Sequence, residues 1–177
     1  MKDRKNWVRG VAADRGIGMW AAIDEYLELL ERRRAVLLTI VEGLPSVALD
    51  WTPLPAGTSS IAMLAHHCAD DLRWWLVEEL SGRPVGRDRV RAFAVRGEDG
   101  ATLAAVLNAA FDECAAALRG LDPAALERFW PVGIAHPRRG QRQSGHFRVY
   151  YALLHLMEHV GQMQLTRQLW EAANARV

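Results

Sequence analysis

Helical periodicity in four long segments is the feature that most constrains the fold of this chain. Apolar residues recur every three or four positions over residues 19–43, 60–80, 100–120 and 146–173. That spacing places the apolar side chains on one face of a helix and the charged side chains on the opposite face. Amphipathic helices of this length bury their apolar faces against one another, so we predict an all-α fold with one hydrophobic core.

The connections between these segments are long and rich in proline or glycine. Residues 44–58 contain three prolines, and residues 130–145 are polar and glycine-rich. Some four-helix bundles contain long crossover connections in place of short loops. We therefore predict a four-helix bundle with long crossover connections, formed by one domain over residues 19–177 and preceded by an N-terminal extension over residues 1–18. A short strand is the alternative to irregular structure at residues 91–95.

Composition and charge exclude several classes of protein. The 177 residues are half apolar and have a formal net charge of +1, which gives no attraction to nucleic acid or to anionic lipid. No apolar run reaches the ~20 residues of a membrane span, and no apolar stretch follows the basic N-terminus as in a secretory signal. Cys68 and Cys114 are too few for a disulfide framework. We expect a cytoplasmic protein without nucleic-acid or membrane partners.

Two histidines on the last predicted helix, His155 and His159, lie four residues apart. Side chains at this spacing share a helix face, with Cβ atoms ~5–6 Å apart, so both imidazoles can reach one divalent ion. A third histidine from a facing helix would complete a site with one open coordination position, as in catalytic zinc sites. Gln162 and Thr166 continue this face, and such a polar seam on a core-forming helix needs a partner inside the bundle or contact with solvent.

The second predicted helix contains two adjacent histidines, His66 and His67. The residues on the stripe of His67 are mainly large and apolar: Ile61, Leu64, Asp71 and Trp74. Those on the stripe of His66 are small or polar: Ala62, Ala69 and Arg73. We expect the second stripe to be the more exposed one, so His67 is the predicted inward histidine.

Each histidine also has a structural interpretation. A single histidine on an apolar face is usually a hydrogen-bonded core residue, and histidine pairs four residues apart also occur on solvated faces. Coordination by three histidines needs the two helices to face each other, which spacing alone does not decide. Asp70 and Asp71 either orient His67 or pair with Arg73 or Arg34 at the surface. No general base is evident beside the histidines.

Two sequence segments, and the order of the elements between them, carry a family resemblance. The segments are RRRAVLLTIVEGLPSVALDWTPLPAGTSSIAMLAHHCADDLRWW and HLMEHVGQ. The first is similar to the first two helices and the long loop, and the second to the terminal H-x-x-x-H-x-G-Q signature, of the DinB-like superfamily. That superfamily of bacterial metal-binding four-helix bundles includes thiol-dependent S-transferases and mycothiol-dependent isomerases. The resemblance runs from about residue 19 to the C-terminus.

The resemblance implies a metal site and a class of activity. It places the family's three metal ligands on His67, His155 and His159, with Zn²⁺ or Ni²⁺ as the expected ion, and it identifies no catalytic residue. It implies a metal-dependent S-transferase that activates a low-molecular-weight thiol, with that thiol and an electrophile as partners. Two alternatives stay open: a non-catalytic, stress-associated bundle whose metal site is structural or vestigial, and a metal-dependent hydrolase.

Adjacent tryptophans predict an apolar surface patch. Trp74 and Trp75 lie ~100° apart around a helix, so one ring is expected to point away from the bundle axis. That ring would form a patch with three apolar neighbours: Leu72, Leu76 and Val77. A homodimer is the commonest way to cover such a patch, and the resemblance also implies a dimer. The alternative cover is a loop of the same chain at residues 83–98.

Overall fold

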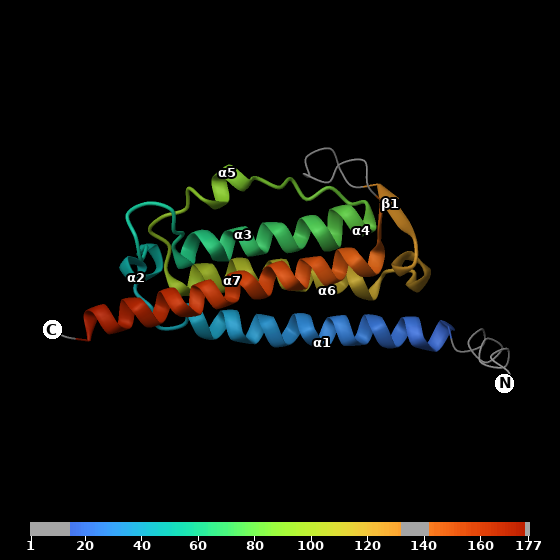
Figure 1. Ribbon diagram of the computed structural model, residues 1–177, viewed down its shortest axis with the longest axis horizontal. Coiled ribbons are helices and arrows are strands. Elements are labelled where there is room, and N and C mark those ends of the chain that lie inside the picture. The colour runs from blue at the N-terminus through green and yellow to red at the C-terminus, as the bar shows by residue number, and fades with distance from the viewer. Residues whose placement is uncertain (1–14, 132–141, 176–177) are drawn as a thin grey trace, which may run out of the picture.

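Four long helices form the bundle in the computed structural model, which describes residues 15–131 and 142–175 (Figure 1). They are α1 (Arg15–Val41), α3 (Ile61–Arg73), α6 (Gly100–Arg119) and α7 (Gly145–Asn174). α1 and α3 each pack against both α6 and α7, so the helices form a ring with α1 and α3 on one diagonal. The prediction of an all-α four-helix bundle is confirmed. α1 already includes the last residues of the predicted extension, and residues 1–14 lie outside the described residues.

A long crossover connects two parallel neighbours in this ring. In Figure 1, α3 and α6 run in one direction, and α1 and α7 run in the other. The crossover (residues 82–99) returns along α3 and contains the short helix α5 (Arg89–Ala92). Asp88 caps α5, because its side chain accepts a hydrogen bond from the backbone N–H of Arg91 at 2.9 Å. The alternative of a strand at residues 91–95 is therefore wrong.

The other connections contain short elements. The first contains α2 (Ser46–Asp50), and α6 is followed by a 3₁₀ turn, η2 (Pro123–Leu126). Two strands, β1 (Phe129–Pro131) and β2 (Arg142–Ser144), then pair in antiparallel fashion ahead of α7. The sequence predicted neither α2 nor the strands, since segments of three to five residues are too short to show a period.

Side-chain caps and one close contact determine where the helices begin. Three polar residues each accept a hydrogen bond from the backbone N–H three residues later, at 3.3, 2.7 and 3.1 Å: Ser60, Asp99 and Ser144. Gly100 follows the second cap and lies against the end of α1. A Cβ atom at Gly100 would lie 2.6 Å from the carbonyl oxygen of Val41, so only glycine allows this approach.

Both adjacent tryptophans are buried, so the predicted apolar patch is wrong. α3 continues into a π-helical turn, η1 (Trp74–Glu78), and then into α4 (Glu79–Ser81). Trp75 packs against α7, with its ring centroid 5.0 Å from that of Tyr151. Trp74 lies beneath the crossover, where the guanidinium of Arg87 is 4.5 Å from the centre of its ring. A loop of the same chain therefore covers the second ring, and neither Trp74 nor Trp75 offers an exposed ring for a dimer contact.

The stripe of α3 that contains His66 is also more buried than predicted. Ala62 and Ala69 are both within the core. The reason is that α3 contacts α2, α5, α6 and α7, which together cover most of its circumference.

α6 is the one helix among the described residues that is long and apolar enough to cross a membrane, with a mean hydropathy of 1.3. It packs against α1 and α3 and buries one side of its surface in the core. Its buried apolar residues are Leu103, Leu107, Ala110, Phe111, Cys114 and Leu118. A core helix of a bundle meets the same criterion, so this signal is weak.

Candidate metal centre

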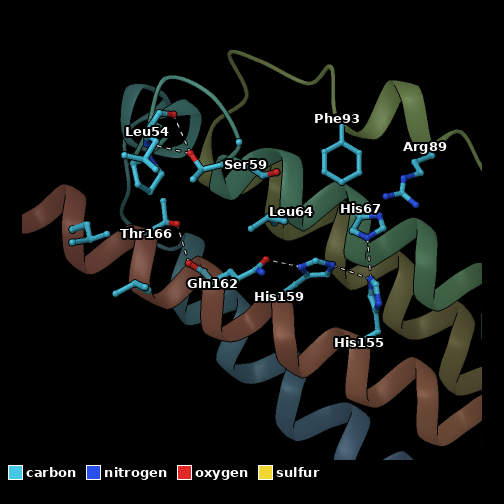
Figure 2. Close-up of a pocket in the computed structure, with 15 residues that line it drawn as sticks. Leu54, Ser59, Leu64, His67, Arg89, Phe93, His155, His159, Gln162 and Thr166 are labelled. Carbon is cyan, nitrogen blue, oxygen red and sulfur yellow. Dashed lines mark hydrogen bonds between the residues drawn. The ribbon is translucent and has the colours of Figure 1, made fainter.

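The three histidines named as candidate ligands meet where α3 faces α7 (Figure 2). His67 comes from α3, and His155 and His159 come from successive turns of α7. The Nε2 atom of His155 lies 3.1 Å from Nε2 of His67 and 2.9 Å from Nε2 of His159. One nitrogen of each ring lies within 4.8 Å of the other two. The two helices therefore face each other, which the spacing of the histidines in the sequence could not decide.

The spacing of these nitrogens fits a tetrahedral ion. Two imidazole nitrogens that bind one zinc ion at about 2.0–2.1 Å lie about 3.3 Å apart, close to the observed 3.1 and 2.9 Å. The side-chain oxygen of Gln162 lies 2.7 Å from Nδ1 of His159. A carbonyl oxygen accepts only from an N–H, so this contact leaves the lone pair of Nε2 for an ion. The donor set therefore fits a divalent metal with a position left open.

Burial favours the neutral form of two of the three histidines, because it lowers the pKa of His67 and of His155. Burial, together with the proximity of His159 and His155, lowers the pKa of His67 from 6.5 to about 3. Burial also lowers the pKa of His155, although the nearby carboxylate of Asp71 acts in the opposite direction. Neutral imidazole is the form that binds a metal, so these rings do not need to lose a proton before coordination.

The fold places Asp71 beside the cluster, with partners that differ from those considered from the sequence. Asp71 lies one helical turn after the histidine of α3, and its Oδ2 atom is 3.8 Å from Nε2 of His155. Arg87 of the crossover binds the other carboxylate oxygen. Arg73 and Arg34, the surface partners considered from the sequence, pair with other carboxylates. The four-residue spacing on α3 was a visible signal, but only the fold brings α7 and the crossover to it.

A cavity of about 480 Å³ opens onto the three histidines (Figure 2). Its walls come from the loop after α2, the first turns of α3, the region of α5 and the second half of α7. The apolar side chains that line it are Pro53, Leu54, Leu64, Phe93, Leu165 and Leu169. Gln162 and Thr166 also line it, so the polar seam predicted on the last helix faces this cavity.

His66 lies outside the cluster. Its Nε2 atom is 2.7 Å from a carboxylate oxygen of Glu98, near the end of the crossover. This contact ties α3 to the chain just before α6. Its neighbour His67 is 3% exposed and points toward α7, as predicted.

Comparisons with known proteins bear on both fold and family. A solved structure, described as that of the conserved protein of a locus from Enterococcus faecalis, is similar with a TM-score of 0.65 and 16% sequence identity, and the match covers 84% of this chain and 96% of that chain. At this identity the likeness concerns the fold alone. No protein with a curated description matches the chain. The sequence profile of the mycothiol-S-transferase family matches residues 26–172, so the chain belongs to that family.

Proposed function

We propose that the protein is a metal-dependent S-transferase that joins a low-molecular-weight thiol, mycothiol by its family, to an electrophilic small molecule. The observation that carries this proposal is the convergence of three imidazole nitrogens at the floor of a cavity. Three protein ligands with a position left open are typical of catalytic zinc sites, whereas structural sites are closed by a fourth. Family membership supports the thiol as the substrate.

The chain's own residues have separate parts in this reaction. His67, His155 and His159 would hold Zn²⁺ or Ni²⁺, both of which accept imidazole ligands. A bound divalent ion supplies positive charge that lowers the pKa of a thiol and favours the thiolate at neutral pH. The thiolate sulfur forms a bond to the electrophilic carbon while the leaving group departs with its electron pair, and the thiol proton passes to solvent. The apolar walls of the cavity exclude water from this step.

The proposal includes the setting of the reaction. We place the protein in the cytoplasm, with small molecules rather than nucleic acid or membranes as its partners. The near-zero net charge is consistent with that choice, because it provides no long-range attraction to either polyanion.

Elemental analysis of the purified full-length protein tests the metal site. We expect about one divalent ion per chain, because three convergent imidazoles form one binding site. His155→Ala removes the nitrogen that lies between the other two and should remove most of the metal. His66→Ala is the matched control and should keep it. Full metal content in His155→Ala would contradict the proposed ligands.

A conjugation assay tests the reaction itself. Mycothiol and chlorodinitrobenzene should give the thioether and chloride faster with the wild-type protein than with His155→Ala. A protein that binds metal but does not accelerate conjugation would support the non-catalytic alternative. Hydrolysis of an activated ester in the absence of thiol, lost together with the metal, would support the hydrolase alternative.

A further inference from the structure

The cavity above the histidines has a chemical character of its own. Six apolar side chains from four different parts of the chain line it. Its volume of about 480 Å³ lies within the ~300–1,000 Å³ range of small-molecule sites. In a site of this kind, the few polar groups that are not already hydrogen-bonded to the protein determine which ligands bind. We therefore consider the hydrogen bonds of each polar side chain in the lining.

Most polar side chains of the lining are already bonded to the protein. The amide oxygen of Gln162 binds His159, and the hydroxyl of Thr166 donates to the backbone carbonyl of Gln162. The hydroxyl of Thr58 donates to the carbonyl of Leu54 and accepts from its N–H. Among these hydroxyl and amide side chains, only that of Ser59 makes no such bond in the described part of the chain. Besides the Ser59 hydroxyl, only the amide N–H₂ of Gln162 remains unbonded among these side chains in the described part of the chain, so the wall offers few groups to a ligand with many hydroxyl groups, such as the sugar part of mycothiol.

Arg89 is the only permanently charged residue among the described residues that line the cavity. Its guanidinium lies 5.6 Å from the centre of the Phe93 ring, and that ring lies 5.0 Å from the ring of His67. The two other arginines that precede it on the crossover are paired: Arg83 with Glu113 and Arg87 with Asp71. In the described part of the chain, no carboxylate pairs with Arg89. An uncompensated positive charge thus stands at the edge of an apolar cavity, close to the histidines (Figure 2).

We propose that this cavity binds the electrophilic acceptor, and that it prefers an apolar molecule with one anionic group, which contacts Arg89. The proposal rests on the function proposed above and names the class of its second substrate. The apolar body lies between the loop after α2 and α7, and the reactive carbon faces the histidines. The thiol then approaches from the open side with its sugar part in solvent, where water satisfies its hydroxyl groups.

Two fluorescent probes that differ by one sulfonate test the charge preference. Anilinonaphthalene sulfonate is apolar and anionic, and N-phenyl-naphthylamine is its uncharged counterpart. Binding is measured on the full-length protein, both as purified and after chelation, so that the result does not depend on catalysis. Arg89→Met should weaken the binding of the anionic probe about threefold relative to that of the uncharged probe, because it removes a charge contact from an exposed residue at the edge of the cavity. Arg89→Lys should restore most of that preference.

Matched controls separate the cavity from general effects. Arg91→Met removes an exposed arginine two positions away that does not line the cavity, and it should leave both affinities unchanged. Leu165→Asn places a polar side chain in the apolar wall and should weaken the binding of both probes. Leu154→Asn changes an exposed leucine of α7 outside the cavity and should leave the binding of both probes unchanged. An unchanged ratio of the two affinities in Arg89→Met would overturn the charge preference.

Inhibition kinetics test the assignment to the acceptor. The anionic probe should inhibit conjugation competitively with chlorodinitrobenzene and not with the thiol. Competition with the thiol instead would overturn the assignment. The two proposals can fail separately. If the probes bind with the expected charge preference but the protein does not catalyse thiol conjugation, the proposed function is refuted. If the protein catalyses conjugation but probe binding does not depend on Arg89, only this inference is refuted.

Discussion

Gln162 decides which nitrogen of His159 faces the cluster. Its side-chain oxygen lies 2.7 Å from Nδ1 and accepts a hydrogen bond from the Nδ1–H group, which leaves Nε2 free for an ion. Gln162→Leu keeps the approximate volume but removes this acceptor, and it should lower metal affinity about tenfold. Competition with a chelator of known affinity measures the change. Gln168→Leu alters an exposed glutamine on another face of α7 and should leave the affinity unchanged; an equal loss in both variants would contradict the role of Gln162.

The pKa of His67 makes the stability of the metal-free protein depend on pH. That pKa is about 3 in the folded protein and about 6.5 in the unfolded chain. Between these values the unfolded chain binds a proton that the folded protein does not, so the free energy of unfolding falls as the pH falls through this range.

Urea unfolding in chelator at pH 7 and pH 5 measures this effect. The wild-type protein should be less stable at pH 5, and His67→Gln should show a smaller difference between the two pH values. His66→Gln leaves the three clustered histidines in place and should keep the wild-type difference. A wild-type stability that does not change between the two pH values would refute the prediction.

At the scale of elements, the crossover carries or contacts many of the residues that surround the site. Several contacts hold it to the bundle. Among them, Arg87 binds Asp71 of α3, Glu98 binds His66, and the backbone N–H of Gly97 donates to the Asp50 side chain at 2.7 Å. Between these contacts it covers Trp74 and carries the aromatic and cationic residues of the cavity. A connection of this length is therefore part of the site as well as of the topology.

The start of α6 depends on glycine, which a pair of substitutions can show. Gly100→Ala would place a Cβ 2.6 Å from the carbonyl oxygen of Val41, so it should lower the free energy of unfolding by about 1–3 kcal/mol. Gly161→Ala, inside α7, meets nothing within 4 Å and should raise it by about 0.4–1 kcal/mol. Urea denaturation of both variants measures the two effects. Equal stabilities would show that the end of α1 can move away at no cost.

At the scale of the whole molecule, the bundle should remain folded without metal. Its helices bury one continuous apolar core, unlike a small domain that depends on its ion. Circular dichroism after chelation should show a helical protein with a cooperative thermal transition. A coil spectrum would indicate a structural ion and would favour the non-catalytic alternative. The homodimer stays a prediction. Of its two grounds, the exposed tryptophan is absent because Trp74 and Trp75 are buried, and only the family resemblance remains.

Local regularities of the sequence were enough to predict the helices and to place two of the three histidines on one helix face. A period near 3.6 over twenty or more residues is visible in one chain segment, and so are caps such as Asp99 and a pair such as His155 and His159. These features depend on residues a few positions apart, and the chain itself fixes their geometry. His67 was chosen over His66 by the same argument, with the family resemblance in support.

Only the tertiary structure decided what surrounds those residues. Asp71 lies beside the cluster because α7 faces α3, whereas Arg87 and Arg89 lie there because the crossover returns along α3. Trp74 is buried by the same crossover. The stripe of Ala62 and Ala69 is buried because several elements meet α3 from different sides. Contacts between residues far apart in the chain depend on how helices pack and in which direction a connection runs. Neither leaves a period in the sequence. The histidine pair could therefore be predicted from the sequence, whereas the cavity above it could not.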